Sequence, residues 1–63
     1  MPLLLTPENA ARELSIGRTK MFALMASGEV RSIKVEGSRR VPYDALIVYV
    51  NRLTAEQNRS EVG

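Results

Sequence analysis

Residues 15–29, SIGRTKMFALMASGE, decide how the chain folds, because they contain a short helix set between two glycines. Three apolar side chains recur there at the spacing of one helical face: Met21, Leu24 and Met25. Gly28 is well placed to end this helix in a left-handed cap. We therefore expect a helix over about 18–26, with its positive charge at the front and small alanines further along.

A preceding helix is expected over about 7–14. Thr6 followed by Pro7 is a strong start signal, because the hydroxyl satisfies a free backbone amide and proline has no amide to satisfy. Its inward face carries Ala10, Ala11 and Leu14. The glycine-containing connection 15–17 is short enough to join the two helices as a helix-turn-helix. The apolar segment 3–5 is compatible with an edge strand or a hydrophobic lead-in.

After Gly28 the pattern changes from helical to alternating. Residues 31–35 alternate polar and apolar side chains as a half-buried strand does. Residues 36–39 are expected to form a turn and 40–41 a returning strand, which together give a hairpin with a basic tip.

The last expected element is a helix over about 43–53, opened by Pro42. Its core-facing side chains are expected to be Leu46, Tyr49, Val50 and Leu53. The β-branched residues of this segment leave a strand as a rival on propensity alone. Residues 54–63 have no apolar period, and we expect a disordered tail there. The predicted fold is α+β, a small winged helix-turn-helix domain over 1–53, with two helices, a hairpin wing and a C-terminal helix.

Size and composition exclude several classes of protein. A chain of 63 residues forms one small domain, which buries about 60% of its unfolded surface. It has no cysteine, no histidine and a single aspartate, so we expect no disulfide, metal site, cofactor or enzymatic activity. The apolar runs are far shorter than the roughly 20 residues of a membrane span, and the N-terminus lacks the positive region of a signal peptide. We expect a cytoplasmic protein that contacts no membrane.

The charge is unevenly distributed, although the net charge is only +2. Residues 18–40 have two acidic side chains, Glu29 and Glu36, against six basic ones, a local charge of +4 that leaves −1 on each flank. The basic side chains are Arg18, Lys20, Arg31, Lys34, Arg39 and Arg40. This pattern suggests a face that binds a polyanion, and a solvated charged surface is the alternative.

A helix-turn-helix with a basic hairpin fits double-stranded DNA. The second helix of such a motif presents its N-terminal residues to the major groove, where its dipole and free amides also favour phosphate. The methyl group of Ala23 is expected to touch a thymine methyl, and Arg39 and Arg40 to enter the minor groove or bind phosphates. The alternatives are that the alanines are only good helix formers and that the arginines are solvated turn charges. The candidate DNA-binding residues are Arg18, Thr19, Lys20, Ala23, Lys34, Ser38, Arg39 and Arg40.

Over residues 3–53 the chain resembles the excisionase-type DNA-binding domains, a branch of the winged-helix proteins related to the MerR-type N-terminal domain. The matching segments are LTPENAA (5–11), LSIGRT (14–19), Phe22 with Leu24-Met25, SGEV (27–30), and RVP (40–42) with Ala45-Leu46. The resemblance implies that the second helix enters the major groove and the hairpin reaches the adjacent minor groove. Many relatives have a basic residue where this chain has Ala23 and Ala26, so fewer polar groups face the bases.

The resemblance implies two functions. Small members often act as recombination directionality factors, which bind repeated sites, bend DNA and help an integrase, a tyrosine or serine recombinase, to excise a mobile element. Other members are transcriptional regulators. We favour the first function, with a MerR-like regulator as the alternative. A protein-interaction module without DNA binding is a third hypothesis, from a different class.

The helix at 43–53 has more apolar residues than one buried face requires. Ile47 and Val48 cannot both be buried beside Leu46 in so small a domain, so we expect one of them to be exposed. Our hypothesis is a contact with a neighbouring copy on tandem DNA sites or with the integrase. An ordinary scattered surface residue is the alternative.

Overall fold

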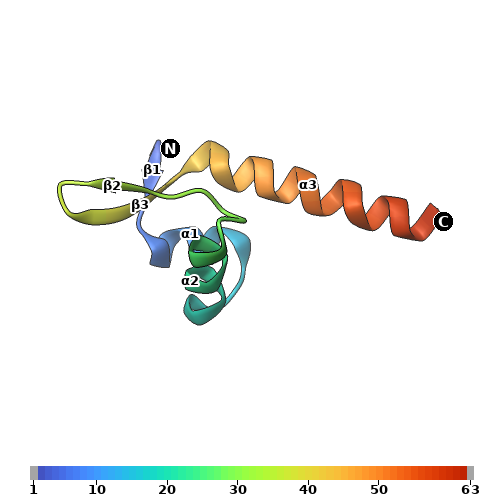
Figure 1. The fold of residues 1–63 in the computed structure, drawn as a ribbon, viewed down its shortest axis with the longest axis horizontal. Helices are drawn as coiled ribbons and strands as arrows, with labels where there is room; N and C mark the ends of the chain where they lie inside the picture. The colour runs from blue at the N-terminus through green and yellow to red at the C-terminus, as the bar shows by residue number, and fades with distance from the viewer. Residues whose placement is uncertain (1, 63) are drawn as a thin grey trace.

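The computed structural model describes residues 2–62, which form an α+β fold of three helices and a three-stranded antiparallel sheet. The strands are β1 (Leu4–Leu5), β2 (Ile33–Val35) and β3 (Ser38–Pro42), and the helices are α1 (Pro7–Leu14), α2 (Arg18–Ser27) and α3 (Tyr43–Val62). Figure 1 shows α1 and α2 together beneath the sheet, while the β2–β3 hairpin and α3 point in opposite directions. The predicted fold class is confirmed, and the arrangement is compatible with a small winged helix-like domain.

The first two helices begin and end where local signals predict. The Asn9 backbone amide donates to Thr6 Oγ1 at 3.2 Å, and Pro7 occupies the first helical position. Ser15 adopts the left-handed conformation, with φ 58°, and ends α1. Gly28, with φ 84°, ends α2. The capping residues bind the free backbone groups at the helix ends and stop each helix from continuing. The observed bounds of both helices therefore agree with the predicted bounds to within one residue.

The sheet joins the start of the chain to its second half. Its order is β1-β3-β2, so β3 is central. Leu4 pairs with Pro42 and Leu5 with Val41, so the segment 3–5 contains an edge strand rather than only a hydrophobic lead-in, and the strand covers residues 4–5. The Tyr43 amide donates to the Leu3 carbonyl at 2.8 Å and fixes the start of α3 against the same edge.

The hairpin turn is tighter than expected. It consists of Glu36 and Gly37, with φ 50° and 84°, and a two-residue turn with positive φ at both positions matches the twist of the paired strands. The predicted turn at 36–39 is therefore wrong, because Val35 pairs with Ser38 and places Ser38 and Arg39 within β3. The predicted basic tip is also wrong. Basic side chains lie along the strands, and the tip itself is formed by a glutamate and a glycine.

One small core lies between the helices and the sheet. Each of the first two helices, the central strand, the loop after α2 and the start of α3 contributes to it. Its buried hydrophobic members are Leu5, Ala10, Ala11, Met21, Leu24, Val30, Val41 and Leu46. The inward faces predicted for α1 and α2 are confirmed, with Leu14 and Met25 half-buried at the margin.

The third helix is longer than expected. The segment after Pro42 is a helix rather than a strand, as we favoured. The helix continues to Val62, so its predicted end at 53 is wrong. Most of the segment expected to be a disordered tail is therefore helical. Gly63 lies outside the described residues. Leu46 is buried and Tyr49 half-buried, whereas Val50 is 42% exposed and is wrongly predicted as core-facing. The molecule is 45 Å long and 18 Å thick, and the far half of α3 extends past the rest (Figure 1).

Candidate nucleic-acid interface

The outward face of α2 carries small side chains. Met21 and Leu24 turn the opposite side of the helix into the core, which leaves Thr19, Ala23 and Ala26 exposed. Successive residues rotate by about 100° around a helix, so the side chains of Arg18 and Lys20 leave on opposite flanks of this face. The three predicted residues at the front of α2 are thus all exposed, but they do not form one cluster.

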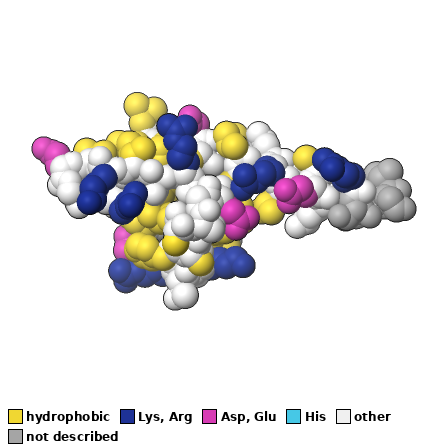
Figure 2. Space-filling model, in the orientation of Figure 1, with side chains coloured by type: hydrophobic (Ala, Val, Ile, Leu, Met, Phe, Trp, Pro, Cys, Tyr) yellow, Lys and Arg dark blue, Asp and Glu magenta, His cyan; other side chains and the backbone are white. Residues whose placement is uncertain are grey.

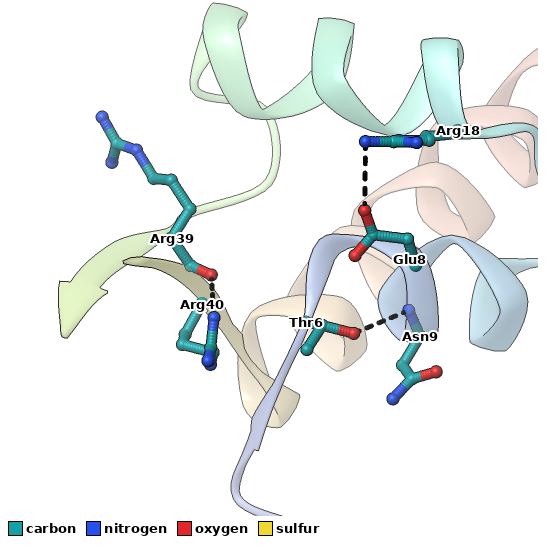
Figure 3. Close-up of polar contacts among 6 residues, drawn as sticks. All are labelled: Thr6, Glu8, Asn9, Arg18, Arg39 and Arg40. Carbon is teal, nitrogen blue, oxygen red and sulfur yellow. Dashed lines mark hydrogen bonds and ion pairs between the residues drawn. The ribbon is translucent and has the colours of Figure 1, made fainter. Parts of the chain in front are cut away.

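Arg18 is held by two contacts that sequence reasoning did not identify. Its Nη2 lies 3.3 Å from Glu8 Oε2 on α1, as Figure 3 shows. Its guanidinium also lies over the ring of Phe22, 5.5 Å from the ring centroid. The spacing of four residues between Arg18 and Phe22 is a signal for the second contact. The contact with Glu8 depends on how α1 packs against α2, and no pattern in the sequence predicts it.

The basic residues of the hairpin divide between its two faces. Lys34 and Arg39 are cross-strand partners, so their side chains lie side by side. Neighbouring residues of a strand point to opposite faces, which separates Arg40 from Arg39. Arg40 is half-buried, and its Nη1 donates to the Arg39 carbonyl at 2.9 Å (Figure 3). Ser38 is exposed at the start of β3. The structure therefore places Arg39 and Lys34 together and leaves Arg40 apart.

A groove of about 310 Å³ connects α2 to the hairpin. It is lined by Phe22, Met25, Ala26, Ser32 and Arg39. Arg39 Nη1 donates to Ser32 Oγ at 3.4 Å across one side of it. In the face shown in Figure 2, basic side chains lie on the hairpin and on the helical part beneath it, with hydrophobic surface between them. The groove therefore combines an apolar lining with a cation and a hydroxyl, and Ser32 is a member that the sequence analysis missed.

The exposed apolar residues of α3 form a separate surface. Ile47 is 46% and Val48 62% exposed, so both predicted contact residues face solvent rather than one. They are neighbours in sequence and point about 100° apart. Arg52 Nη2 donates to the Glu29 carbonyl at 2.9 Å and ties the middle of α3 to the loop after α2.

Among residues 2–62, no group of three histidine, cysteine, aspartate or glutamate side chains is placed to hold a metal ion. Within the same residues, none of the helices combines the length and hydropathy that crossing a bilayer requires. The exposed groups of α2 and the hairpin include guanidinium, ammonium, hydroxyl and methyl groups, which suit phosphates and base edges.

Comparison with known proteins identifies relatives of one kind. A probable excisionase of Saccharopolyspora erythraea is 48% identical over 56 residues, which cover 89% of this chain and 57% of the relative. An excisionase of Streptomyces ambofaciens is 48% identical over 44 residues, which cover 70% of this chain and 69% of the relative. This chain thus spans little more than half the length of the first relative. No family model and no solved structure matches it. The identity to the Streptomyces protein over more than two thirds of both chains shows that this chain belongs to the excisionase family.

Proposed function

We propose that the chain is a DNA-binding accessory factor, not an enzyme, which promotes the integrase-mediated excision of a mobile element. Two relatives named excisionase support the role in excision. The observation that carries the DNA-binding part is the groove that connects the outward face of α2 to Arg39 of the hairpin. One continuous surface then presents a helix to the major groove and a strand pair to the minor groove beside it.

The geometry supports a specific division of contacts on DNA. The small side chains Thr19 and Ala23 let α2 approach the floor of the major groove closely, with the methyl of Ala23 against a thymine methyl. Arg18 and Lys20 leave on opposite flanks of α2, and Lys20 reaches the phosphates along one wall of that groove. Many protein–DNA hydrogen bonds go to phosphate and sugar and fix the position of the protein on the duplex.

The DNA strand between the two grooves passes over the groove between α2 and the hairpin. Its sugars contact the apolar lining, and a phosphate accepts from Arg39 and from Ser32. Lys34, beside Arg39, adds a second cation to the same hairpin face. Ser38, next to Arg39 in β3, adds an exposed hydroxyl. Arg40 binds a phosphate on the opposite face of the hairpin from Arg39.

We further propose that the protein fills repeated sites, bends the DNA and contacts a partner through α3. Ile47 and Val48 are exposed in the first turns of α3, the helix that points away from the hairpin (Figure 1), which leaves them accessible while α2 and the hairpin are occupied. The partner is a neighbouring copy on tandem sites or the integrase. A single compact domain with few polar groups facing the bases gains selectivity when copies bind cooperatively.

The experiment begins with duplexes selected by the wild-type protein from a random-sequence pool. Lys20→Ala should weaken binding to selected and random duplexes alike, and should reduce the slope of log affinity against log salt by about 0.9, the contribution of one phosphate contact. Arg12→Ala is the matched control, because Arg12 is exposed on α1 and lines a different groove with Asn9 and Tyr43.

Three outcomes decide the proposal. Loss of affinity for the selected duplex alone, at constant slope, shows that Lys20 reads a base and contradicts its assignment to phosphate. Binding without any salt dependence overturns the DNA-binding role. Absence of a recombinase gene beside that of this protein, or failure of the wild-type protein to stimulate excision by such a recombinase despite tight DNA binding, favours the transcriptional alternative.

A further inference from the structure

Arg18 has two side-chain partners, Glu8 on α1 and Phe22 on its own helix. The carboxylate of Glu8 engages one of its terminal nitrogens at 3.3 Å. Arg18 Cζ lies over the ring of Phe22, 5.5 Å from the ring centroid. A guanidinium has five N–H donors in a fixed fork, so these contacts leave other donors free for a ligand. The Arg18 side chain is 69% exposed, and such a pair contributes little to stability.

The carboxylate of Glu8 changes what Arg18 can bind. The first turn of α2 contains no acidic residue, and the positive end of the helix dipole disfavours a cation there. Glu8 supplies the missing negative charge from α1. The same carboxylate repels any phosphate that approaches Arg18, because like charges within a few ångströms raise the free energy of the complex. Lys20, on the opposite flank of α2, is not subject to this repulsion.

We propose that Glu8 is a specificity-determining residue, which positions Arg18 for the edge of a base and discourages its binding to phosphate. The base edge that fits is guanine, whose N7 and O6 accept two hydrogen bonds from one guanidinium. These acceptors are uncharged, so the carboxylate beside Arg18 opposes them far less than it opposes a phosphate. This inference rests on the proposed DNA-binding function and gives a role to a residue outside α2 and the hairpin.

The sign of the effect separates this role from that of a simple surface charge. Removal of a negative charge strengthens the attraction of the protein for any duplex, so Glu8→Gln should bind a scrambled duplex more tightly. If Glu8 also positions Arg18, the same variant should bind the duplex selected by the wild-type protein less tightly. We expect the ratio of the two affinities to fall about tenfold, the discrimination that one base contact provides.

Glu13→Gln is the matched control. Glu13 is exposed on the same helix, has the same charge, and lines the groove with Pro2 and Tyr43 rather than the contact with Arg18. It should strengthen binding to both duplexes by a similar factor and keep their ratio. Thermal unfolding of both variants shows that each is folded. A repeated selection with Glu8→Gln should lose the preference for guanine at one position and keep the rest.

A double-mutant cycle connects the effect to Arg18. In an Arg18→Ala background, Glu8→Gln should leave the affinity ratio unchanged, because the side chain that it positions is gone. The proposal is overturned if Glu8→Gln and Glu13→Gln behave alike, or if Glu8→Gln changes the ratio without Arg18. In both cases the DNA-binding function stands if Lys20→Ala still weakens binding to DNA. If Lys20→Ala and Arg39→Ala both leave binding intact, the proposed function itself fails.

Discussion

The body of the molecule, residues 4–46, and the distal part of α3, residues 47–62, differ in how they are held together. Every buried side chain that the structure describes lies between Leu5 and Leu46. The body is built from elements too short to be stable alone, among them a two-residue strand and an eight-residue helix. The distal part of α3 exposes Ile47, Val48 and Val50. Tyr49 still packs against the core, so the contrast indicates that the body supplies most of the stability and the distal helix supplies mainly surface.

The largest effect is expected in the core of the body. Met21 is fully buried at the centre of the hydrophobic cluster, so Met21→Ala should lower the free energy of unfolding by about 2–5 kcal/mol. Val50→Ala, in the distal part, should change it by less than about 0.5 kcal/mol. Urea denaturation followed by circular dichroism measures both values. Equal losses in the two variants mean that α3 is part of the core and that the contrast is wrong.

The next effect concerns DNA rather than stability. Arg39→Ala should weaken binding to selected and random duplexes by about 1.5–3 kcal/mol, the contribution of a charged hydrogen bond, with little change in unfolding. Arg59→Ala removes the same charge from the distal helix, where the side chain is also exposed, and should cost much less. Titration of both variants tests the contrast. Unchanged affinity of Arg39→Ala for both duplexes removes the hairpin from the interface.

A smaller effect is expected at the hairpin turn, the part of the body farthest from the core. Gly37 has φ 84°, so Gly37→Val should cost about 1–2 kcal/mol, because a side chain is strained in the left-handed region. Gly17 has φ −74° and open space around it, so Gly17→Ser should change stability by only a few tenths of a kcal/mol. If both variants unfold like the wild type, the positive φ at the turn carries no strain.

The smallest change in stability belongs to the distal surface. Ile47→Glu and Val48→Glu should each alter the free energy of unfolding by no more than about 0.5 kcal/mol, because both side chains already face solvent. A variant that keeps its affinity for a single site but loses cooperative filling of two sites, or loses excision, supports a partner contact. Two folded variants that match the wild type in every assay rule that contact out.

The elements that sequence reasoning placed correctly are those with a local cause. Thr6 followed by Pro7 and the glycine at 28 act through hydrogen bonds and dihedral angles within a few residues, so their effects can be read from neighbours in the chain. The hairpin turn was misplaced because Glu36 adopts φ 50°, a conformation that is uncommon for glutamate and is not signalled by its chemistry. The misplacement moved Arg39 from a strand to a tip.

The end of α3 was missed for a different reason. Its far half has no apolar period that would predict a buried face, and its helix follows from propensity, with good formers such as Ala55, Gln57 and Arg59. For the candidate site, the sequence predicted which basic side chains are exposed, but not the side chains that they contact. Glu8 meets Arg18 only through the packing of α1 against α2, which no spacing in the sequence encodes. Ser32 meets Arg39 through the register of the hairpin, which the misplaced turn hid.

The pairing of β1 with β3 has a consequence for the order of folding. The contacts of α1 with α2, and of β2 with β3, join residues close in sequence and form quickly, whereas Leu5 has to meet Val41 across most of the domain. Leu4 and Leu5 are synthesised early in the chain, yet they pair only after β3 has emerged from the ribosome. The strand made first is therefore expected to dock last, and until it does so one edge of Val41, at the centre of the sheet, stays unpaired.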